Sequence, residues 1–265
     1  LQTCRLLLAK NLLTDTCLPV IEVAMAAGFG SLRRFNDLFK KHYRLSPTAL
    51  RKQVKSEKSR GAAVTLALGY RPPYQWEKML GFLALRAIPG VELVKDGEYL
   101  RTVRIAAPDG KTVSGWVGIG HKPQNNALSV TVDSALLPVL PQVLVRVRHL
   151  FDLYCNPDIV YETLLPMNDI RPVLCAAGTR VPGCFDSFEM AVRAVLGQQI
   201  TVKGARTLAA RLVDRYGTPL PTGIAGLTHT FPSPQEILDV EGSIGDSLGP
   251  LGIIGARART IHELA

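Results

Sequence analysis

A polar, charged stretch over residues 53–60 divides this chain into two segments with different patterns of apolar residues. Before it, apolar residues recur at helical spacing, and after it strand-like alternation gives way to further helical patterns. The stretch itself has no apolar periodicity, so we predict a linker from Gln53 to Arg60. The expected fold class is α+β. It comprises an all-helical segment over residues 1–60, a small lobe with an antiparallel sheet over residues 61–135, and an incomplete helical lobe over residues 136–265.

Positive charge is concentrated before that linker. Residues 1–60 contain 12 Lys and Arg against 4 Asp and Glu, whereas residues 61–265 contain 19 against 18. The excess on the first segment favours a polyanionic partner, because Lys and Arg displace the counterions that condense on phosphates. A solvated basic tail is the alternative that charge alone leaves open.

The remaining composition excludes several classes of protein. No apolar run approaches the roughly 20 residues that cross a bilayer, so we expect no membrane partner. The five cysteines lie far apart without a C-x-x-C pair, which argues against a zinc site and a disulfide framework. We therefore predict a cytoplasmic protein that needs no metal or cofactor. The chain begins without Met or a signal-peptide pattern, and we interpret both ends as truncated.

Two short helices around a glycine turn are predicted within the basic segment. The first runs from Val20 to Ala27 behind Pro19, and Gly28-Phe29-Gly30 forms the turn. Ser31 is the expected N-cap of the second helix, which has an apolar stripe on one face and basic residues on the others. Such a pair of helices has the geometry of helix-turn-helix recognition of DNA.

The residues expected to contact DNA lie on the second helix and directly after it. Arg33, Arg34 and Asn36 are assigned to the major groove, since their side chains can pair with base edges. The later cations are assigned to phosphates, which position the protein without reading sequence. The full predicted set is Ser31, Arg33, Arg34, Asn36, Lys40, Lys41 and Arg44.

Strand-like and helical patterns follow the linker. The predicted strands are Val64–Leu68, Glu98–Ala106, Lys111–Gly118 and Leu128–Val132, with a turn at Pro108-Asp109-Gly110. The predicted helices are Gln75–Ala87, Pro141–Leu153, one beginning after Asp186 and one from Thr201 to Gly217. Glu189 follows Asp186 by three positions, and we interpret the two as a variant of the capping box.

The first segment resembles a known family of regulators. The stretch PVIEVAMAAGFGSLRRFNDLFKKHYRLSPTALR, from Pro19 to Arg51, is similar to the second helix-turn-helix of AraC-type transcription regulators. Residues 1–14 resemble the helix that links the two such motifs in this family. The resemblance implies binding to double-stranded operator DNA, with RNA polymerase as a further expected partner.

The rest of the chain resembles the AlkA type of 3-methyladenine DNA glycosylase. The resemblance rests on YRPPYQWEKMLGFLALRAIPGVE from Tyr70, FDLYCNPDIV from Phe151 and RVPGCFDSFEMAVRAVLGQQITV from Arg180. A weaker match, LGIIGARARTIHELA, closes the chain. The joined halves resemble bacterial adaptive-response proteins. What this implies is an enzyme that flips an alkylated purine out of the duplex and hydrolyses its N-glycosidic bond.

Few site residues of that family can be assigned here. Phe82 matches the aromatic that the first lobe contributes to the base pocket, and ordinary helix core is the alternative for it. Gln199 stands where the family's prototype has a Leu wedge that fills the gap left by the flipped nucleotide, and Gln198 lies beside it. The family's catalytic aspartate follows a hairpin of the Gly-Ile-Gly kind. Neither is found before Ala265, so no catalytic residue is assigned and this fragment is expected to be inactive alone.

A second function is left open by the residues. The chain could be a non-enzymatic regulator whose glycosylase-like lobe senses damaged DNA, and the polar Gln199 favours this alternative slightly. Base release by the complete protein would distinguish the two hypotheses.

Overall fold

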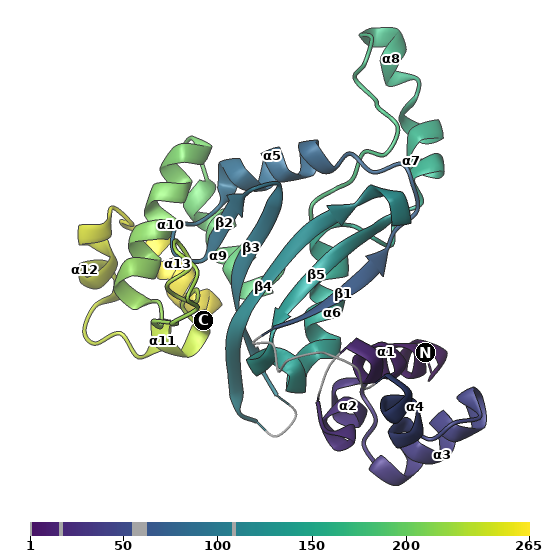
Figure 1. The fold of residues 1–265 in the computed structure, drawn as a ribbon. Helices are drawn as coiled ribbons and strands as arrows, with labels where there is room; N and C mark the ends of the chain where they lie inside the picture. Colours follow the sequence, from purple (N-terminus) through teal and green to yellow (C-terminus); the bar gives the residue numbers. More distant parts are fainter. Residues whose placement is uncertain (1, 16–17, 55–62, 108–109) are drawn as a thin grey trace.

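The computed structural model describes residues 2–15, 18–54, 63–107 and 110–265. It consists of an antiparallel sheet with helices on several sides (Figure 1). This mixed architecture confirms the predicted α+β class. None of the helices in these ranges is both long and apolar enough to cross a membrane.

The N-terminal segment is a bundle of four helices. They are α1 (Gln2–Asp15), α2 (Val20–Ala26), α3 (Leu32–Tyr43) and α4 (Pro47–Val54). The predicted turn is confirmed: Gly28 has a φ of +81°, a conformation that favours glycine, and the Ser31 hydroxyl accepts a hydrogen bond from the Arg34 amide at 3.4 Å. Phe35 and Phe39 are fully buried in the bundle.

The predicted linker begins too early. Gln53 and Val54 form the last turn of α4, because the helix that starts at Pro47 continues through them. The Ser46 hydroxyl caps this helix by accepting from the Ala49 amide at 3.1 Å. Residues 55–60 of the predicted linker lie outside the described residues.

The sheet has five strands in the order β1-β5-β4-β3-β2, and every neighbouring pair is antiparallel. The strands are β1 (Ala63–Gly69), β2 (Glu92–Lys95), β3 (Glu98–Ala106), β4 (Thr112–Lys122) and β5 (Ala127–Asp133). All the predicted strands are confirmed, and β4 runs four residues past Gly118. Strand β2 was not predicted, since its sequence, Glu92-Leu93-Val94-Lys95, does not alternate apolar and polar residues. Pro108 and Asp109 of the predicted turn lie outside the described residues.

Helices cover the sheet and extend beyond it. They are α5 (Trp76–Arg86), α6 (Leu140–Leu150), α7 (Pro157–Leu164), α8 (Met167–Ile170), α9 (Ser187–Gly197), α10 (Val202–Tyr216), α11 (Pro234–Leu238), α12 (Ile244–Leu248) and α13 (Ala256–Leu264), with 3-10 turns η1 (Pro123–Asn125), η2 (Ser134–Val139) and η3 (Gly249–Leu251). The α6 helix ends at Leu150, three residues before the predicted end. In Figure 1, α7 and α8 project away from the sheet.

Two clusters of buried apolar residues hold these elements together. One joins the N-terminal bundle, the sheet and α6, and α2 packs against η2 where the bundle meets the sheet. The other joins Ile88 and Val91, after α5, to helices α9–α13. Figure 1 shows the bundle and helices α10–α13 on different sides of the sheet. The division at residue 135 stays a prediction.

Candidate functional site

The residues predicted to contact DNA lie on α3 or at its two caps. Ser31, Arg33, Arg34, Lys40, Lys41 and Arg44 are exposed, and Asn36 is half-buried. Arg44 ends α3 in the left-handed conformation, with its amide bonded to the Lys40 carbonyl at 2.9 Å. The apolar face of α3 is turned inward through Phe35 and Phe39, so the basic residues remain available to a partner. Leu32, at the start of this face, is 37% exposed.

A pocket of about 380 Å³ lies where α5, β2, β3, α9 and α10 meet. Its lining combines apolar and charged side chains. The apolar and aromatic members include Phe82, Leu83, Ile88, Leu150, Phe185, Met190, Ile200 and Val202. The charged members are Arg86, Glu92, Arg101, Asp186, Glu189, Arg193 and Arg206. A concave, mostly apolar cavity with a few convergent polar groups is the usual form of a ligand site.

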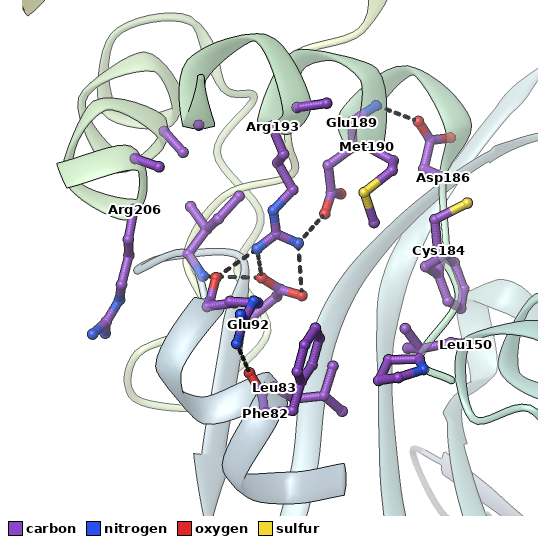
Figure 2. Close-up of a pocket in the computed structure, with 18 of the residues that line it drawn as sticks. Phe82, Leu83, Glu92, Leu150, Cys184, Asp186, Glu189, Met190, Arg193 and Arg206 are labelled. Atoms are coloured by element: carbon purple, nitrogen blue, oxygen red, sulfur yellow. Dashed lines mark hydrogen bonds and ion pairs between the residues drawn. The ribbon is translucent and has the colours of Figure 1, made fainter. Parts of the chain in front are cut away.

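Four of the charged residues form a buried ion cluster beneath this pocket. Arg101 donates to Glu189 at 2.6 Å, and Arg193 donates to Glu189 at 3.0 Å. Arg193 also pairs with Glu92, which accepts from the Tyr99 hydroxyl at 2.5 Å and from the Ile88 amide at 2.9 Å. Figure 2 shows the Arg193 side chain reaching between Glu189 and Glu92. The cluster therefore ties β2 and β3 of the sheet to α9.

These neighbours favour the ionised forms of Glu92 and Arg101. Burial would raise the pKa of Glu92, but Arg193 and Arg101 outweigh it and hold that pKa below its ordinary value. Burial would lower the pKa of Arg101, but Glu189 outweighs it and holds that pKa above its ordinary value. Burial and the nearby Glu92 raise the pKa of Tyr99 well above its ordinary range, so its hydroxyl remains a donor.

The Phe82 ring lies at the pocket with an arginine against it. The ring is 39% exposed, and the Arg86 guanidinium carbon lies 3.7 Å from its centroid. Arg86 Nη1 also donates to the Phe82 carbonyl at 3.2 Å. The guanidinium thus has cation–π contact with the ring and is oriented by a backbone bond one helical turn away.

The α9–α10 turn borders the same pocket. Gly197, Ile200 and Val202 line the cavity, while Gln198 and Gln199 between them are exposed. Gln199 has a φ of +55°, which is uncommon for a residue other than glycine. The Gln198 carbonyl accepts from Arg257 at 2.5 Å, and this bond joins the turn to α13.

The structure brings some predicted residues together and separates others. Phe82 and the turn that carries Gln199 meet at one pocket, although they lie far apart in the sequence. The α3 residues lie in the bundle, away from that pocket (Figure 1). Val202, at the start of α10, lines the pocket with its side chain 45% exposed.

The interpretation of Glu189 as a capping-box partner is also wrong. Asp186 does cap α9 by accepting from the Glu189 amide at 3.0 Å. The Glu189 side chain, however, turns to Arg101 and Arg193. Glu92, Arg101 and Arg193 were not predicted at all. Burial is the property that makes them notable, and no local pattern in the sequence distinguishes a buried arginine from a solvated one.

Two family descriptions match this chain. Residues 65–186 match the AlkA N-terminal domain. Residues 1–53 match a helix-turn-helix domain. The first match covers the sheet, α5, α6 and the approach to α9, and the second covers the helical bundle.

Curated relatives match both parts. The chain is 38% identical over 265 residues to the "Probable bifunctional transcriptional activator/DNA repair enzyme AlkA" of Mycobacterium tuberculosis, covering 98% of this chain and 51% of that protein. It is 37% identical over 201 residues to "DNA-3-methyladenine glycosylase 2" of Escherichia coli, covering 75% of this chain and 65% of that protein. The chain thus spans about half to two thirds of the length of these relatives.

A solved structure shares the fold. The 3-methyladenine DNA glycosylase of Archaeoglobus fulgidus superposes with a TM-score of 0.55 at 22% identity, over 75% of this chain and 66% of that one. At this identity the likeness concerns the fold alone.

Proposed function

Because this chain joins an AraC-type helix-turn-helix domain to the N-terminal domain of AlkA-type glycosylases, we propose that the complete protein is a DNA-binding regulator that also excises alkylated purines. The observation that carries this proposal is the joining of two DNA-directed modules, one with a basic helix and one with an aromatic-walled pocket. Double-stranded DNA is the proposed partner of both.

The bundle is proposed to bind operator DNA through α3. The exposed Arg33 and Arg34 are suited to base edges, and Lys40 and Lys41 in the last turn are suited to phosphates. RNA polymerase is proposed as a further partner, because the relative from M. tuberculosis is named a transcriptional activator. The exposed basic residues of α3 support the DNA contact. The proposed contact with RNA polymerase is supported by the name of that relative alone.

The pocket is proposed to receive a base swung out of the duplex. Extrusion costs a few kcal/mol and costs least for a damaged base, which gives part of the selectivity. Phe82 offers an aromatic face inside the cavity, and Gln199 stands at its rim on an exposed turn. Gln198 and Gln199 would then occupy the gap that the extruded nucleotide leaves.

Release of methylated bases tests the enzymatic proposal. We expect the full-length protein to liberate 3-methyladenine from methylated duplex DNA, measured by chromatography of the released bases. The matched control is the same protein in which Asn replaces the aspartate that the family resemblance places after a hairpin beyond residue 265; this variant should bind the DNA and release nothing. Binding to methylated DNA without release of any base by the unaltered protein would contradict the proposal.

The wedge proposal predicts a selective loss of affinity. Gln199→Ala should weaken binding to a duplex with an abasic-site analogue by about tenfold, because the side chain that fills the gap is removed. Binding to the undamaged duplex should stay unchanged, since no gap exists there. Gln199→Leu is the matched variant and should retain the affinity, because it also fills the gap. Fluorescence anisotropy measures each affinity, and equal losses on both duplexes would refute the wedge role.

A further inference from the structure

The turn between α9 and α10, which carries the proposed wedge residue Gln199, has few hydrogen bonds of its own. The Gln198 amide lies 3.4 Å from the Val195 carbonyl, which is longer than the usual range for such a bond. Within the described residues, neither Gln199 nor Ile200 makes a hydrogen bond. The φ of +55° at Gln199 is a conformation that a residue other than glycine keeps only where its surroundings hold it. The shape of the turn therefore depends on a contact from outside it.

Arg257 of α13 supplies that contact. Its Nη2 donates to the Gln198 carbonyl at 2.5 Å. Gln198 is the C-cap of α9, so its carbonyl is one of the acceptors that the end of a helix leaves without a partner. A cation at this end also complements the negative end of the helix dipole. Within the described residues, no carboxylate pairs with Arg257, so no ion pair competes with this bond.

The backbone of Arg257 is fixed in the core of the protein. The next residue, Ala258, and Ile261 one turn later are both 0% exposed, and they belong to the apolar cluster that joins α13 to α9. Helix α13 packs directly against α9. The guanidinium therefore reaches the turn from a helix that is anchored to the same core as the turn itself.

A donor on the Gln198 carbonyl fixes the orientation of the next residue. The Gln198 carbonyl and the Gln199 amide belong to one planar peptide unit. Holding its oxygen holds the plane from which the Gln199 Cα continues, and with it the direction in which the Gln199 side chain leaves the turn. A side chain that is already oriented loses less conformational entropy when it enters a gap in the duplex.

We infer that Arg257 is a positioning residue that holds the α9–α10 turn in the conformation from which Gln199 enters the gap left by an extruded nucleotide. This inference rests on the proposed function and deepens it, because it names the group that orients the wedge. Arg257 acts through the Gln198 carbonyl and does not touch the base. A direct contact between this cation and a DNA phosphate is the rival role that the experiment must exclude.

A double-mutant cycle on the full-length protein separates the two roles. We expect Arg257→Met to weaken binding to a duplex with an abasic-site analogue by about fivefold, because the bond that orients the turn is lost. Binding to the undamaged duplex should change less than about twofold. In the Gln199→Ala background, Arg257→Met should change the affinity for the abasic-site duplex by less than about twofold, since no wedge remains to be oriented. Fluorescence anisotropy at constant salt measures each affinity.

A neighbouring arginine supplies the matched control for charge. Arg259 is exposed on the same helix and has no hydrogen bond to the turn among the described residues. Arg259→Met removes the same charge and should leave the ratio of the affinities for the two duplexes unchanged. Arg257→Lys keeps the charge and a donor, and it should keep that ratio within about twofold.

A measurement on the unaltered protein covers the case in which Arg257→Met fails to fold. Nuclear magnetic resonance relaxation of backbone amides reports the order of the turn without DNA. We expect order parameters of about 0.85 for Gln199 and Ile200, the value typical of a rigid backbone. Values below about 0.6 would overturn the inference, since the turn would then be flexible with Arg257 in place.

The remaining outcomes distinguish this inference from the proposed function. A loss in Arg257→Met that is equal on both duplexes, or that persists in the Gln199→Ala background, would indicate direct contact with DNA and overturn the inference. An unchanged affinity of Arg257→Met for the abasic-site duplex also overturns it, while the preference of the unaltered protein for that duplex still supports the wedge. Absence of this preference in the unaltered protein overturns the wedge proposal and the inference with it.

Discussion

Replacing Arg101 with Met is expected to lower the free energy of unfolding by about 3–5 kcal/mol, the usual cost of removing one partner from a buried ion pair. The Arg101 side chain is 4% exposed and that of Glu189 is 5% exposed. The substitution leaves one Glu189 carboxylate oxygen without its 2.6 Å donor, in a side chain that is 5% exposed. Chemical denaturation monitored by circular dichroism measures the change.

A surface pair of the same type supplies the control for this prediction. Arg146 contacts Asp186 at 3.2 Å, but these side chains are 31% and 36% exposed. Arg146→Met should therefore cost about 1 kcal/mol or less. Combining Arg101→Met with Glu189→Gln should cost less than Arg101→Met alone, because no unpaired charge remains. Equal losses for Arg101→Met and Arg146→Met would contradict the importance assigned to burial.

Replacing Arg33 and Arg34 together with Ala is expected to weaken specific operator binding by about 100-fold, since each arginine paired to a base edge contributes about 1–3 kcal/mol. Both side chains are exposed on α3, which is anchored from behind by Phe35 and Phe39. Stability should change little, because neither side chain is buried in the bundle. Anisotropy titrations on duplexes selected by the unaltered protein from a random library measure the loss.

Matched variants on the same helix test the division between base and phosphate contacts. Lys40→Ala and Lys41→Ala should weaken binding to all duplexes alike and reduce the dependence on salt. Binding of an abasic-site duplex at the pocket should be unaffected by Arg33→Ala and Arg34→Ala, because α3 lies away from the pocket (Figure 1). Loss of both activities together would show that the bundle and the pocket do not act independently.

Local features were predictable from the sequence to a considerable extent. Ser31 caps α3 and Gly28 makes the turn before it because capping and positive φ are preferences of single residues. The strands that alternate over seven or more residues were also predicted, with errors at their ends. Strand β2 was not, because its pairing of Glu92 with Arg101 depends on β3 rather than on its own pattern.

Part of the candidate site could likewise be predicted from the sequence, and part could not. Resemblance to a family predicted roles for Phe82 and Gln199, and the charge of residues 1–60 predicted a DNA-binding segment. Arg86 follows Phe82 by one helical turn and contacts its ring. Nothing in the sequence indicates that this arginine faces a pocket. The pairing of Arg101 with Glu189 joins residues 88 positions apart, beyond the reach of any periodicity.

By itself, the sequence determined which segments become helices and strands, where the positive charge gathers, and which residue types are available to contact DNA. These depend on backbone preferences and on charge, which are properties of neighbouring residues. The tertiary structure alone decided which charges are buried together and which arginine covers the aromatic ring. Burial and long-range pairing arise only when α5, the sheet and α9 are packed against one another, because that packing removes water and sets the distances between charges.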